Sequence, residues 1–206
     1  MRILVTGAGG FVGKYLVREL LTHNYDVIAF DLPSVYQHPL PVKTVSGDIQ
    51  DRESVYNLVK EYHPEACIHL SAISFVPKGW SNIQSMFAVN VIGTLNLLEA
   101  LRTTTQRSRI LVISSAEVYG KIARARPVQE NDFFHPENPY AISKVAVDEF
   151  TLLYAKRYKM HTMIARPFNH IGPGQSSFFA IPSFAKQLAA IAHSETPAIL
   201  QVGNLD

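Results

Sequence analysis

The chain has 206 residues, of which 47% are hydrophobic and 17% charged, and its formal net charge is +2. This composition excludes intrinsic disorder, and the length suits one compact domain or one domain with part of a second. Basic side chains are scattered apart from Lys121, Arg124 and Arg126, which excludes a nucleic-acid-binding surface but leaves room for a single anionic small molecule.

Short apolar runs alternate along the chain with segments of helical periodicity. The runs that predict strands are residues 3–7, 26–31, 43–48, 66–72, 109–115 and 161–167. The segments that predict helices are 11–23, 51–62, 82–104 and 139–159. This alternation predicts an α/β fold, a doubly wound parallel sheet with helices on both faces. Two long connections follow the fourth and fifth strands, at the carboxyl ends where open α/β sheets bind ligands.

The segment that joins the first predicted strand to the first predicted helix reads TGAGGFVG, at residues 6–13. In this setting Gly7 permits a tight turn, Gly10 lets backbone N–H groups approach a pyrophosphate, and Gly13 lets the helix sit close to the sheet. The positive end of the helix dipole also favours phosphate. The loop therefore predicts a dinucleotide site, and the alternative is a turn without a ligand.

Asp31 ends the next strand, eighteen residues after Gly13. A carboxylate there would accept hydrogen bonds from the adenosine ribose hydroxyls and repel a 2′-phosphate, which favours NAD over NADP. The alternative is a solvated aspartate in a turn before Pro33.

Tyr140 and Lys144 lie on one face of a predicted helix, because they are four residues apart. Asn138 is the expected cap and Pro139 the expected first residue of this helix. An ammonium near a phenol favours the phenolate, so we expect Lys144 to lower the pKa of Tyr140 and make it a proton donor to a reduced carbonyl. The alternative is a pair of surface neighbours.

Ser114 and Ser115 end the fifth predicted strand, where a hydroxyl could hydrogen-bond both a substrate oxygen and Tyr140. Glycine loop, acidic strand end, strand-end serine and Tyr/Lys pair occur in the order that one mechanism requires. The predicted reaction is hydride transfer.

These motifs carry a family resemblance that covers essentially the whole chain. The chain resembles the extended short-chain dehydrogenases/reductases, the NAD-dependent epimerase/dehydratase family that modifies nucleotide sugars. The motifs are TGAGGFVG, GDI at 47–49, HLSA at 69–72, NVIGTLNLLEA at 90–100, SSAEVYG at 114–120 and YAISK at 140–144. SFVP at 74–77, ARPFNHIGPGQS at 165–176, FAKQLAAI at 184–191 and VGNLD at 202–206 are similar to the reductases of GDP-4-keto-6-deoxymannose, which make GDP-rhamnose.

The resemblance implies roles for individual residues. It implies cofactor contacts by Gly7, Gly10, Phe11, Val12, Gly13, Asp31, Asp48, Ile49, Leu70, Ser71, Ala72, Asn90, Ser114, Tyr140, Lys144, Pro167 and Phe168. Among these, Asp48 and Ile49 would flank the adenine, Asn90 would brace the wall 70–72, and Lys144 would bond the nicotinamide ribose. It implies substrate contacts by Ser74, Ser115, Glu117, Asn169, His170 and Gln175, with Ser115 as the catalytic hydroxyl and Ser114 as its structural neighbour. From composition alone, residues 170–175 are an ordinary Gly/Pro turn.

Glu117 distinguishes between reactions within this family. Related 4,6-dehydratases have a glutamate at this place, and many 4-epimerases have a threonine, so Glu117 argues against an epimerase. Dehydratases also have an acid or a serine at position 116, where Ala116 offers no acid–base group. The sequence therefore predicts reduction of the C4 ketone of a GDP-4-keto-6-deoxy-hexose by NAD(P)H: Tyr140 donates the proton to O4, Ser115 polarises the carbonyl, Lys144 tunes Tyr140 and Glu117 positions the sugar. A 4,6-dehydratase or a 4-epimerase of the same family is the alternative.

The remaining cysteine and histidines predict structure rather than chemistry. Cys67 is expected in the core and excludes a disulfide within the chain. His69 is expected as a packing histidine, and His23, His38 and His63 as solvent-facing ones. The eight histidines show no metal-ligand spacing, so we predict no metal.

The ends of the chain lead to expectations about location and completeness. Met1 opens on an apolar run without a basic leader, and no segment approaches the about 20 apolar residues of a membrane span, so we expect a cytoplasmic protein with no membrane partner. The family continues well past Asp206, so we expect residues 1–170 to form the dinucleotide-binding domain and 171–206 to begin a truncated substrate-binding region. A non-catalytic dinucleotide-binding fragment is therefore a further alternative.

Family members pair through two long helices, which implies a homodimer through 82–104 and 139–159. Leu95, Leu98 and Leu101 could serve either that interface or the core.

Overall fold

The computed structural model describes residues 1–33, 42–74, 80, 82–105, 107–121, 126–193 and 198–203. The chain divides into two compact units, Met1–Phe168 and Asn169–Asp206. Predictions for His38, Arg124, most of SFVP and the last three residues of VGNLD lie outside the described residues.

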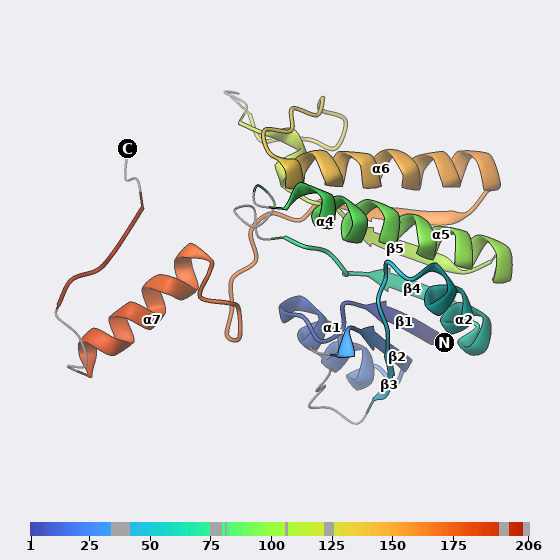
Figure 1. Ribbon diagram of the computed structural model, residues 1–206, viewed down its shortest axis with the longest axis horizontal. Coiled ribbons are helices and arrows are strands. Elements are labelled where there is room, and N and C mark those ends of the chain that lie inside the picture. The colour runs from blue at the N-terminus through green and yellow to red at the C-terminus, as the bar shows by residue number, and fades with distance from the viewer. Residues whose placement is uncertain are drawn as a thin grey trace. The chain divides into compact units, whose positions relative to one another are not determined.

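The first unit is built on a parallel sheet of six strands (Figure 1). The strands are β1 Arg2–Thr6, β2 Asp26–Asp31, β3 Lys43–Ser46, β4 Ala66–His69, β5 Arg109–Ile113 and β6 His161–Ala165, in the order β3-β2-β1-β4-β5-β6. Thr6 is level with both Phe30 of β2 and His69 of β4. The order reverses between β1 and β4, and such a switch point is where open α/β sheets bind ligands. The predicted Rossmann-type fold is confirmed.

Several helices of the first unit begin at a side chain that caps them. The helices and helical turns described in this unit are α1 Phe11–Thr22, α2 Arg52–Tyr62, α4 Ile83–Phe87, the π-helical turn η2 Ala88–Ile92, α5 Gly93–Thr104, the short 3₁₀ helix η3 Ala116–Tyr119 and α6 Pro139–Tyr158. Asp51, Asn82 and Asn138 cap α2, α4 and α6, each with a side-chain oxygen that accepts a backbone N–H of the first turn. The predicted start of α6 at Asn138 and Pro139 is confirmed.

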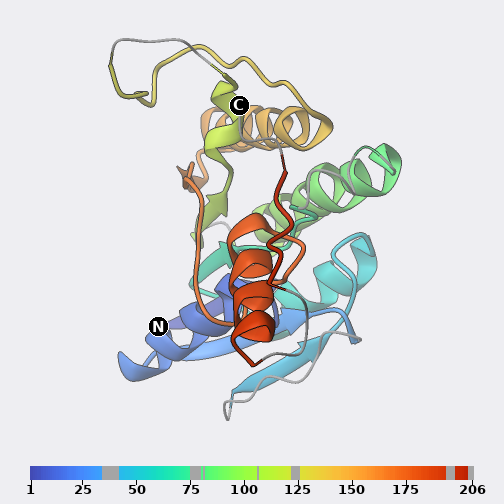
Figure 2. The same cartoon turned by 90° about the vertical axis from the view of Figure 1, so that its left-hand side faces the viewer.

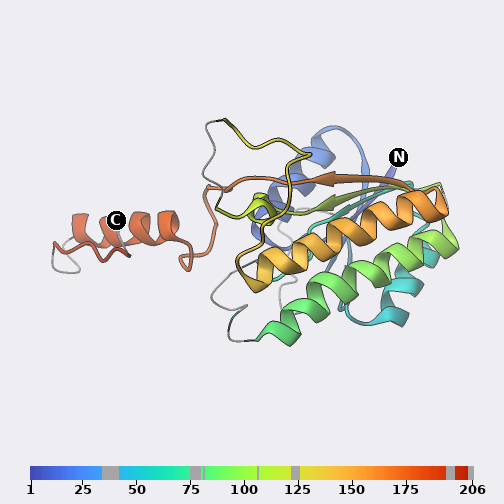
Figure 3. The same ribbon diagram turned by 90° about the horizontal axis from the view of Figure 1, so that it is seen from above.

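Helices cover both faces of the sheet, with α1 on one face and α5 and α6 on the other (Figures 2 and 3). Val17 of α1 packs with Ile3, Val5 and Val27. The larger cluster joins α2, α5 and α6 to the opposite face, and its fully buried members include Leu4, Val55, Leu97, Leu98, Leu101, Ile110 and Val112. Each such side chain stabilises the fold by roughly 1.5–3 kcal/mol. Leu98 and Leu101 are therefore core residues.

The structure corrects several predicted boundaries. β3, β4, β5 and β6 end two or three residues before the apolar runs do, because the last residues of each run leave the ladder and form the site described below. The segment 82–104 is not one regular helix, because η2 interrupts it at Asn90, whose side chain bonds backbone outside the helix. The second unit contains α7, Ala180–Ala192, which we did not predict as a helix. Cys67 is 1% exposed, and burial raises the pKa of its thiol, which confirms it as a core residue.

Candidate active site

The candidate residues of the first unit follow the carboxyl ends of all six strands. The glycine loop follows β1, Asp31 ends β2, and Asp48 and Ile49 follow β3. Residues 70–74 follow β4, Ser114 and Ser115 follow β5, and Pro167 and Phe168 follow β6. Because parallel strands end at one edge of the sheet, these segments lie along a single edge.

The glycine loop has the close contacts that glycines permit. Gly7 has a φ of 71°, and its N–H donates to the Phe30 carbonyl over 2.9 Å. A Cβ added to Gly13 would lie 2.3 Å from the Gly7 carbonyl oxygen, so only glycine lets α1 start this near the loop. The N-terminus of α1 has no side-chain cap. Its first-turn N–H groups and the helix dipole therefore fit a pyrophosphate.

Asp31 is tied to the glycine loop. One carboxylate oxygen accepts the Gly9 N–H over 2.8 Å, and the other accepts the Leu32 N–H over 2.8 Å. A carboxylate has about four acceptor sites, so both oxygens can still accept ribose hydroxyls. The predicted ribose contact stays a prediction that this geometry allows.

Two further predicted adenine neighbours are also held in place. The Asp48 carboxylate accepts the Gln50 N–H over 2.9 Å. Ile49 is 5% exposed and packs against Gly93 of α5, so its side chain belongs to the core. Their contact with adenine stays a prediction.

The segment 70–73, which we call the cofactor wall, lies against the glycine loop. A Cβ on Gly7 would be 2.8 Å from the Ser71 nitrogen, so the two backbones touch. Asn90 of η2 braces the wall from the other side: its Oδ1 accepts the Ile73 N–H over 2.8 Å, and its Nδ2 donates to the Ile73 carbonyl over 3.1 Å. Asn90 is 1% exposed. The geometry agrees with the bracing role that the family resemblance implies.

Ser115 caps η3, since its Oγ accepts the Glu117 N–H over 3.1 Å. Ser114 donates its backbone N–H to the Ala165 carbonyl of β6, and Ala116 donates to the Pro167 carbonyl. The buried Ser114 Oγ has no hydrogen-bond partner among the described residues. The strand-end serines are thus fixed by backbone bonds to the segment that carries Pro167.

Tyr140 and Lys144 occupy the first turns of α6 and are 9% and 5% exposed. The Lys144 Nζ lies 5.8 Å from the centre of the Tyr140 ring and donates to the Ile113 carbonyl over 2.7 Å. That carbonyl ends β5, one residue before Ser114. The structure therefore brings Tyr140 and Lys144 to the end of β5, where the strand-end serines stand.

The structure corrects the predicted pKa of Tyr140. Burial raises the pKa of the phenol, the hydrogen bond with Ser115 lowers it, and the Glu117 charge raises it, with a net increase. Burial lowers the pKa of Lys144 to about 8, against the opposing effect of Asp148. The expected lowering of the Tyr140 pKa by Lys144 is therefore wrong, because burial of the phenol is the largest effect and raises the pKa.

Glu117 is exposed at the start of η3, and its Oε2 accepts the Asn138 Nδ2–H over 3.1 Å. Asn138 in turn caps α6 through its Oδ1, which accepts the Ala141 N–H over 2.8 Å. Glu117 is therefore fixed relative to Tyr140, two residues after this cap.

Arg166 joins the connection after β5 to α6, a feature that sequence reasoning missed. Its Nε donates to the fully buried Asp148 over 2.7 Å, and its Nη1 donates to the Tyr119 hydroxyl and the Glu130 carbonyl over 2.8 Å each. The guanidinium also lies 4.8 Å from the centre of the Phe134 ring. The sequence does indicate that Asp148 lies on the same face of α6 as Lys144, because the two are four residues apart. It does not indicate that Asp148 pairs with Arg166, which lies beyond the end of this helix.

His69 is a structural histidine, as predicted. It is 3% exposed, its Nδ1 is 2.7 Å from the Thr6 hydroxyl and its Nε2 is 2.9 Å from the Thr94 hydroxyl. Burial and the nearby Lys144 lower its pKa to about 3, so the ring is neutral at physiological pH. His23 and His63 are exposed, also as predicted.

The predicted substrate residues Asn169, His170 and Gln175 belong to the second unit. Residues 172–175 form a turn closed by the Gln175 N–H and the Gly172 carbonyl over 3.2 Å, with Gly174 at a φ of 85°. The Gln175 Oε1 is buried without a partner among the described residues. Ser74, in the first unit, is exposed at the end of the cofactor wall. The substrate roles of these residues stay predictions.

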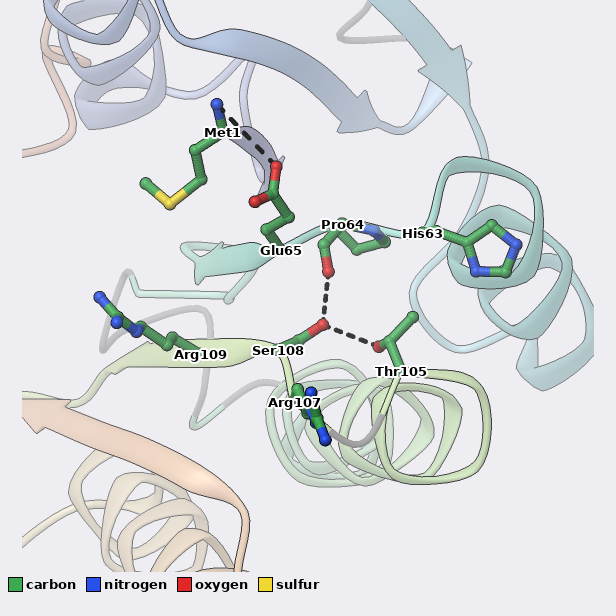
Figure 4. Close-up of a pocket in the computed structure, with 8 residues that line it drawn as sticks. All are labelled: Met1, His63, Pro64, Glu65, Thr105, Arg107, Ser108 and Arg109. Carbon is green, nitrogen blue, oxygen red and sulfur yellow. Dashed lines mark hydrogen bonds and ion pairs between the residues drawn. The ribbon is translucent and has the colours of Figure 1, made fainter.

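A cavity of about 530 Å³ lies at the other edge of the sheet, near the amino ends of β4 and β5 (Figure 4). Glu65, Arg107 and Arg109 line it, with Ser108, whose hydroxyl donates to the Pro64 carbonyl. It also lies beside the carboxyl ends of α2 and α5, where the helix dipoles oppose an anion. Within the described ranges, no three His, Cys, Asp or Glu residues gather as metal ligands, and no helix is long and apolar enough to cross a bilayer.

The chain is similar to several known proteins. The sequence matches the family described as GDP-mannose 4,6 dehydratase over residues 4–206. It is 36% identical to GDP-6-deoxy-D-mannose reductase of Pseudomonas aeruginosa, over all of this chain and 64% of that protein. The fold matches RMD from Pseudomonas aeruginosa complexed with NADPH, with a TM-score of 0.86, 36% identity and coverage of 100% of this chain and 66% of that one.

A UDP-glucose 4-epimerase of Thermus thermophilus in complex with NAD also matches, with a TM-score of 0.85 and 30% identity. The match covers 90% of this chain and 61% of the epimerase chain. The chain thus spans less than two thirds of the length of these relatives.

Proposed function

Because the chain belongs to the GDP-mannose 4,6 dehydratase family, we propose that the protein to which it belongs is a nucleotide-sugar oxidoreductase that reduces the C4 ketone of a GDP-4-keto-6-deoxy-hexose with NAD(P)H. The observation that carries this proposal is the meeting of Ser115, Tyr140 and Lys144 at the end of β5. The 36% identity to a GDP-6-deoxy-D-mannose reductase over the whole chain supports the same reaction.

The chain's own residues divide the work of the reaction. When bound, the reduced dinucleotide supplies the hydride that reaches C4 of the sugar. Tyr140, whose pKa is raised by burial, donates its proton to O4, while Ser115 hydrogen-bonds the carbonyl oxygen and polarises it. Lys144, fixed by the Ile113 carbonyl, holds a positive charge beside Tyr140, which favours the phenolate left after proton transfer.

The alternative reactions are a 4,6-dehydration and a 4-epimerisation. Glu117 stands near Tyr140, as a dehydratase requires, but Ala116 provides no acid for the C6 hydroxyl. Incubation of the full-length protein with GDP-mannose and oxidised dinucleotide tests this directly. The proposal predicts no 4-keto-6-deoxy product; its formation would favour the dehydratase.

We propose that Asp31 gives the enzyme a preference for NAD over NADP as its dinucleotide. We expect Asp31→Asn to raise the ratio of kcat/KM for NADPH to that for NADH roughly tenfold, because the change removes the charge that repels a 2′-phosphate. The asparagine oxygen can still accept the Gly9 N–H. The measurement is the initial rate of sugar reduction with each dinucleotide.

Asp26→Asn is the matched control, since Asp26 lies at the other end of β2 and pairs with Arg2 on the surface. An unchanged ratio in Asp31→Asn, or an equal change in Asp26→Asn, would show that the Asp31 carboxylate does not set the preference.

We also propose roles for the two units of the chain, a product and a cellular location. We assign residues 1–170 to dinucleotide binding and catalysis and 171–206 to the start of a substrate-binding region, with Asn169, His170 and Gln175 facing the sugar nucleotide. The product would be GDP-rhamnose. The single buried cysteine suits the reducing cytoplasm that we propose as its location.

We also propose a homodimer through α5 and α6. Leu98 and Leu101 are in the core, but Ile142, Leu152 and Leu153 of α6 are 47–54% exposed. Apolar side chains of this kind stabilise an interface when buried. Leu153→Glu should convert a dimer to a monomer in sedimentation equilibrium, whereas Glu149→Gln, on the same helix, should not; a wild-type monomer would refute the dimer.

A further inference from the structure

Hydrogen bonds link five residues in the interior between the glycine loop and α6. They are Thr6, His69, Thr94, Asn90 and Ser143, and each is at most 3% exposed. At Asn90 the link passes through the residue itself, because its backbone carbonyl accepts from Thr94 and its side chain makes the onward bonds. We call these five residues the buried relay. They come from β1, β4, α5, η2 and α6, so the relay joins elements on both sides of the switch point.

The first half of the relay fixes the proton positions on His69. The Thr94 hydroxyl donates to the Asn90 carbonyl over 2.5 Å, so it must accept from His69, whose Nε2 carries the proton. The His69 Nδ1 is then an acceptor, and the Thr6 hydroxyl donates to it over 2.7 Å. The Thr6 oxygen in turn accepts the Ser71 N–H over 3.4 Å. Only the neutral ring with this tautomer satisfies every member.

The second half of the relay reaches the helix of Tyr140. Asn90 holds the Ile73 backbone by two hydrogen bonds and donates to the Ser143 hydroxyl over 3.0 Å. The Ser143 hydroxyl donates to the carbonyl of Tyr140 itself over 2.7 Å. Thr6 holds the Ser71 amide and Asn90 holds the Ile73 amide, so two amides of the cofactor wall are held by members of one connected network.

We propose that His69 is a positioning residue. It links Thr6, the last residue of β1 before the glycine loop, to the Thr94–Asn90 pair. In this way it fixes the cofactor wall between the glycine loop and the helix that carries Tyr140. Asn90 alone braces the wall at Ile73, whereas His69 sets the distance between this brace and the glycine loop. The inference rests on the proposed dinucleotide site.

The hydrogen bonds on either side of His69 can be removed by substitutions that preserve the shape of the side chain. Thr6→Val and Thr94→Val each replace a hydroxyl by a methyl group and leave one ring nitrogen of His69 without its partner. We expect each variant to weaken the affinity for NADH or NADPH, measured by dinucleotide fluorescence, by roughly tenfold. The double variant should also lose roughly tenfold rather than a hundredfold, because one link is already broken.

Amide hydrogen exchange in the ligand-free protein gives a readout without turnover. Thr6→Val should speed exchange at Ile73, although Thr6 does not touch that amide, and Thr94→Val should speed exchange at Ser71. His69→Gln and His69→Asn test the ring itself: glutamine can reach Thr94 and asparagine can reach Thr6, so each keeps one link and should behave like the single threonine variants.

Thr151→Val is the matched control, since Thr151 is equally buried and its hydroxyl donates only to Val147 of its own helix. It should leave dinucleotide affinity and exchange at both amides unchanged. Additive losses in the double variant, unchanged exchange at the remote amide, or an equal effect of Thr151→Val would overturn the proposal. Failure of sugar reduction with these binding effects intact would instead refute only the proposed function.

Discussion

Tyr140→Phe is expected to lower kcat for sugar reduction on the order of 100- to 10,000-fold, the usual contribution of a positioned general acid. The phenol is buried, which raises its pKa, and it stands with Ser115 and Lys144 at the end of β5, where it is the proposed proton donor to O4 of the sugar. Phenylalanine keeps the ring and its packing but has no proton to give. The measurement is the steady-state rate of NAD(P)H oxidation with the 4-keto sugar.

The same variant should bind dinucleotide with nearly the affinity of the unchanged protein, because the glycine loop and the cofactor wall are intact. Tyr119→Phe is a matched control: its hydroxyl meets Arg166 in the connection after β5. It should retain most of kcat. If Tyr140→Phe keeps a kcat near that of the wild type, Tyr140 is not the proton donor.

Gly13→Ala is expected to abolish measurable dinucleotide binding and to destabilise the protein by about 1–3 kcal/mol. The added Cβ would lie 2.3 Å from the Gly7 carbonyl oxygen and 2.5 Å from that of Ala8, so α1 must move away from the loop. Titration calorimetry with NADH and NADPH measures the binding, and urea unfolding measures the stability.

Gly10→Ala separates binding from folding. Among the described residues, its Cβ would meet only the Gly7 oxygen, at 3.2 Å, and its φ of −68° suits alanine, so stability should change little while dinucleotide affinity falls. Gly203→Ala, whose Cβ meets no described atom within 4 Å, should change neither quantity. Full dinucleotide affinity in Gly13→Ala would contradict the pyrophosphate role of the loop.

Local sequence patterns predict most of this fold, since each strand of the first unit overlaps a short apolar run and each long helix lies within a predicted helical segment. The location of the site is also predictable, because open α/β sheets bind ligands at the carboxyl ends of their parallel strands. Strand ends are less predictable, because residues such as Leu70 and Ser71 are apolar or small and yet leave the ladder to form the cofactor wall.

The contacts that complete the site depend on tertiary structure. The π-helical turn at Asn90 and the bonds of His69 to Thr6 and Thr94 join residues far apart in the sequence, and no local pattern marks them. The pKa of Tyr140 differed from the prediction because burial depends on the packing of α6 against the sheet. The spacing of Tyr140 and Lys144 gave their proximity but not their burial.

The most direct test of the proposed reduction follows the hydride itself. Full-length protein would be incubated with GDP-4-keto-6-deoxymannose and NADH or NADPH carrying deuterium at both C4 positions of the nicotinamide, and the product examined by NMR. Reduction at C4 predicts stoichiometric oxidation of the dinucleotide and deuterium bonded to C4 of a GDP-6-deoxyhexose. No dinucleotide consumption, or a product without deuterium at C4, would contradict it.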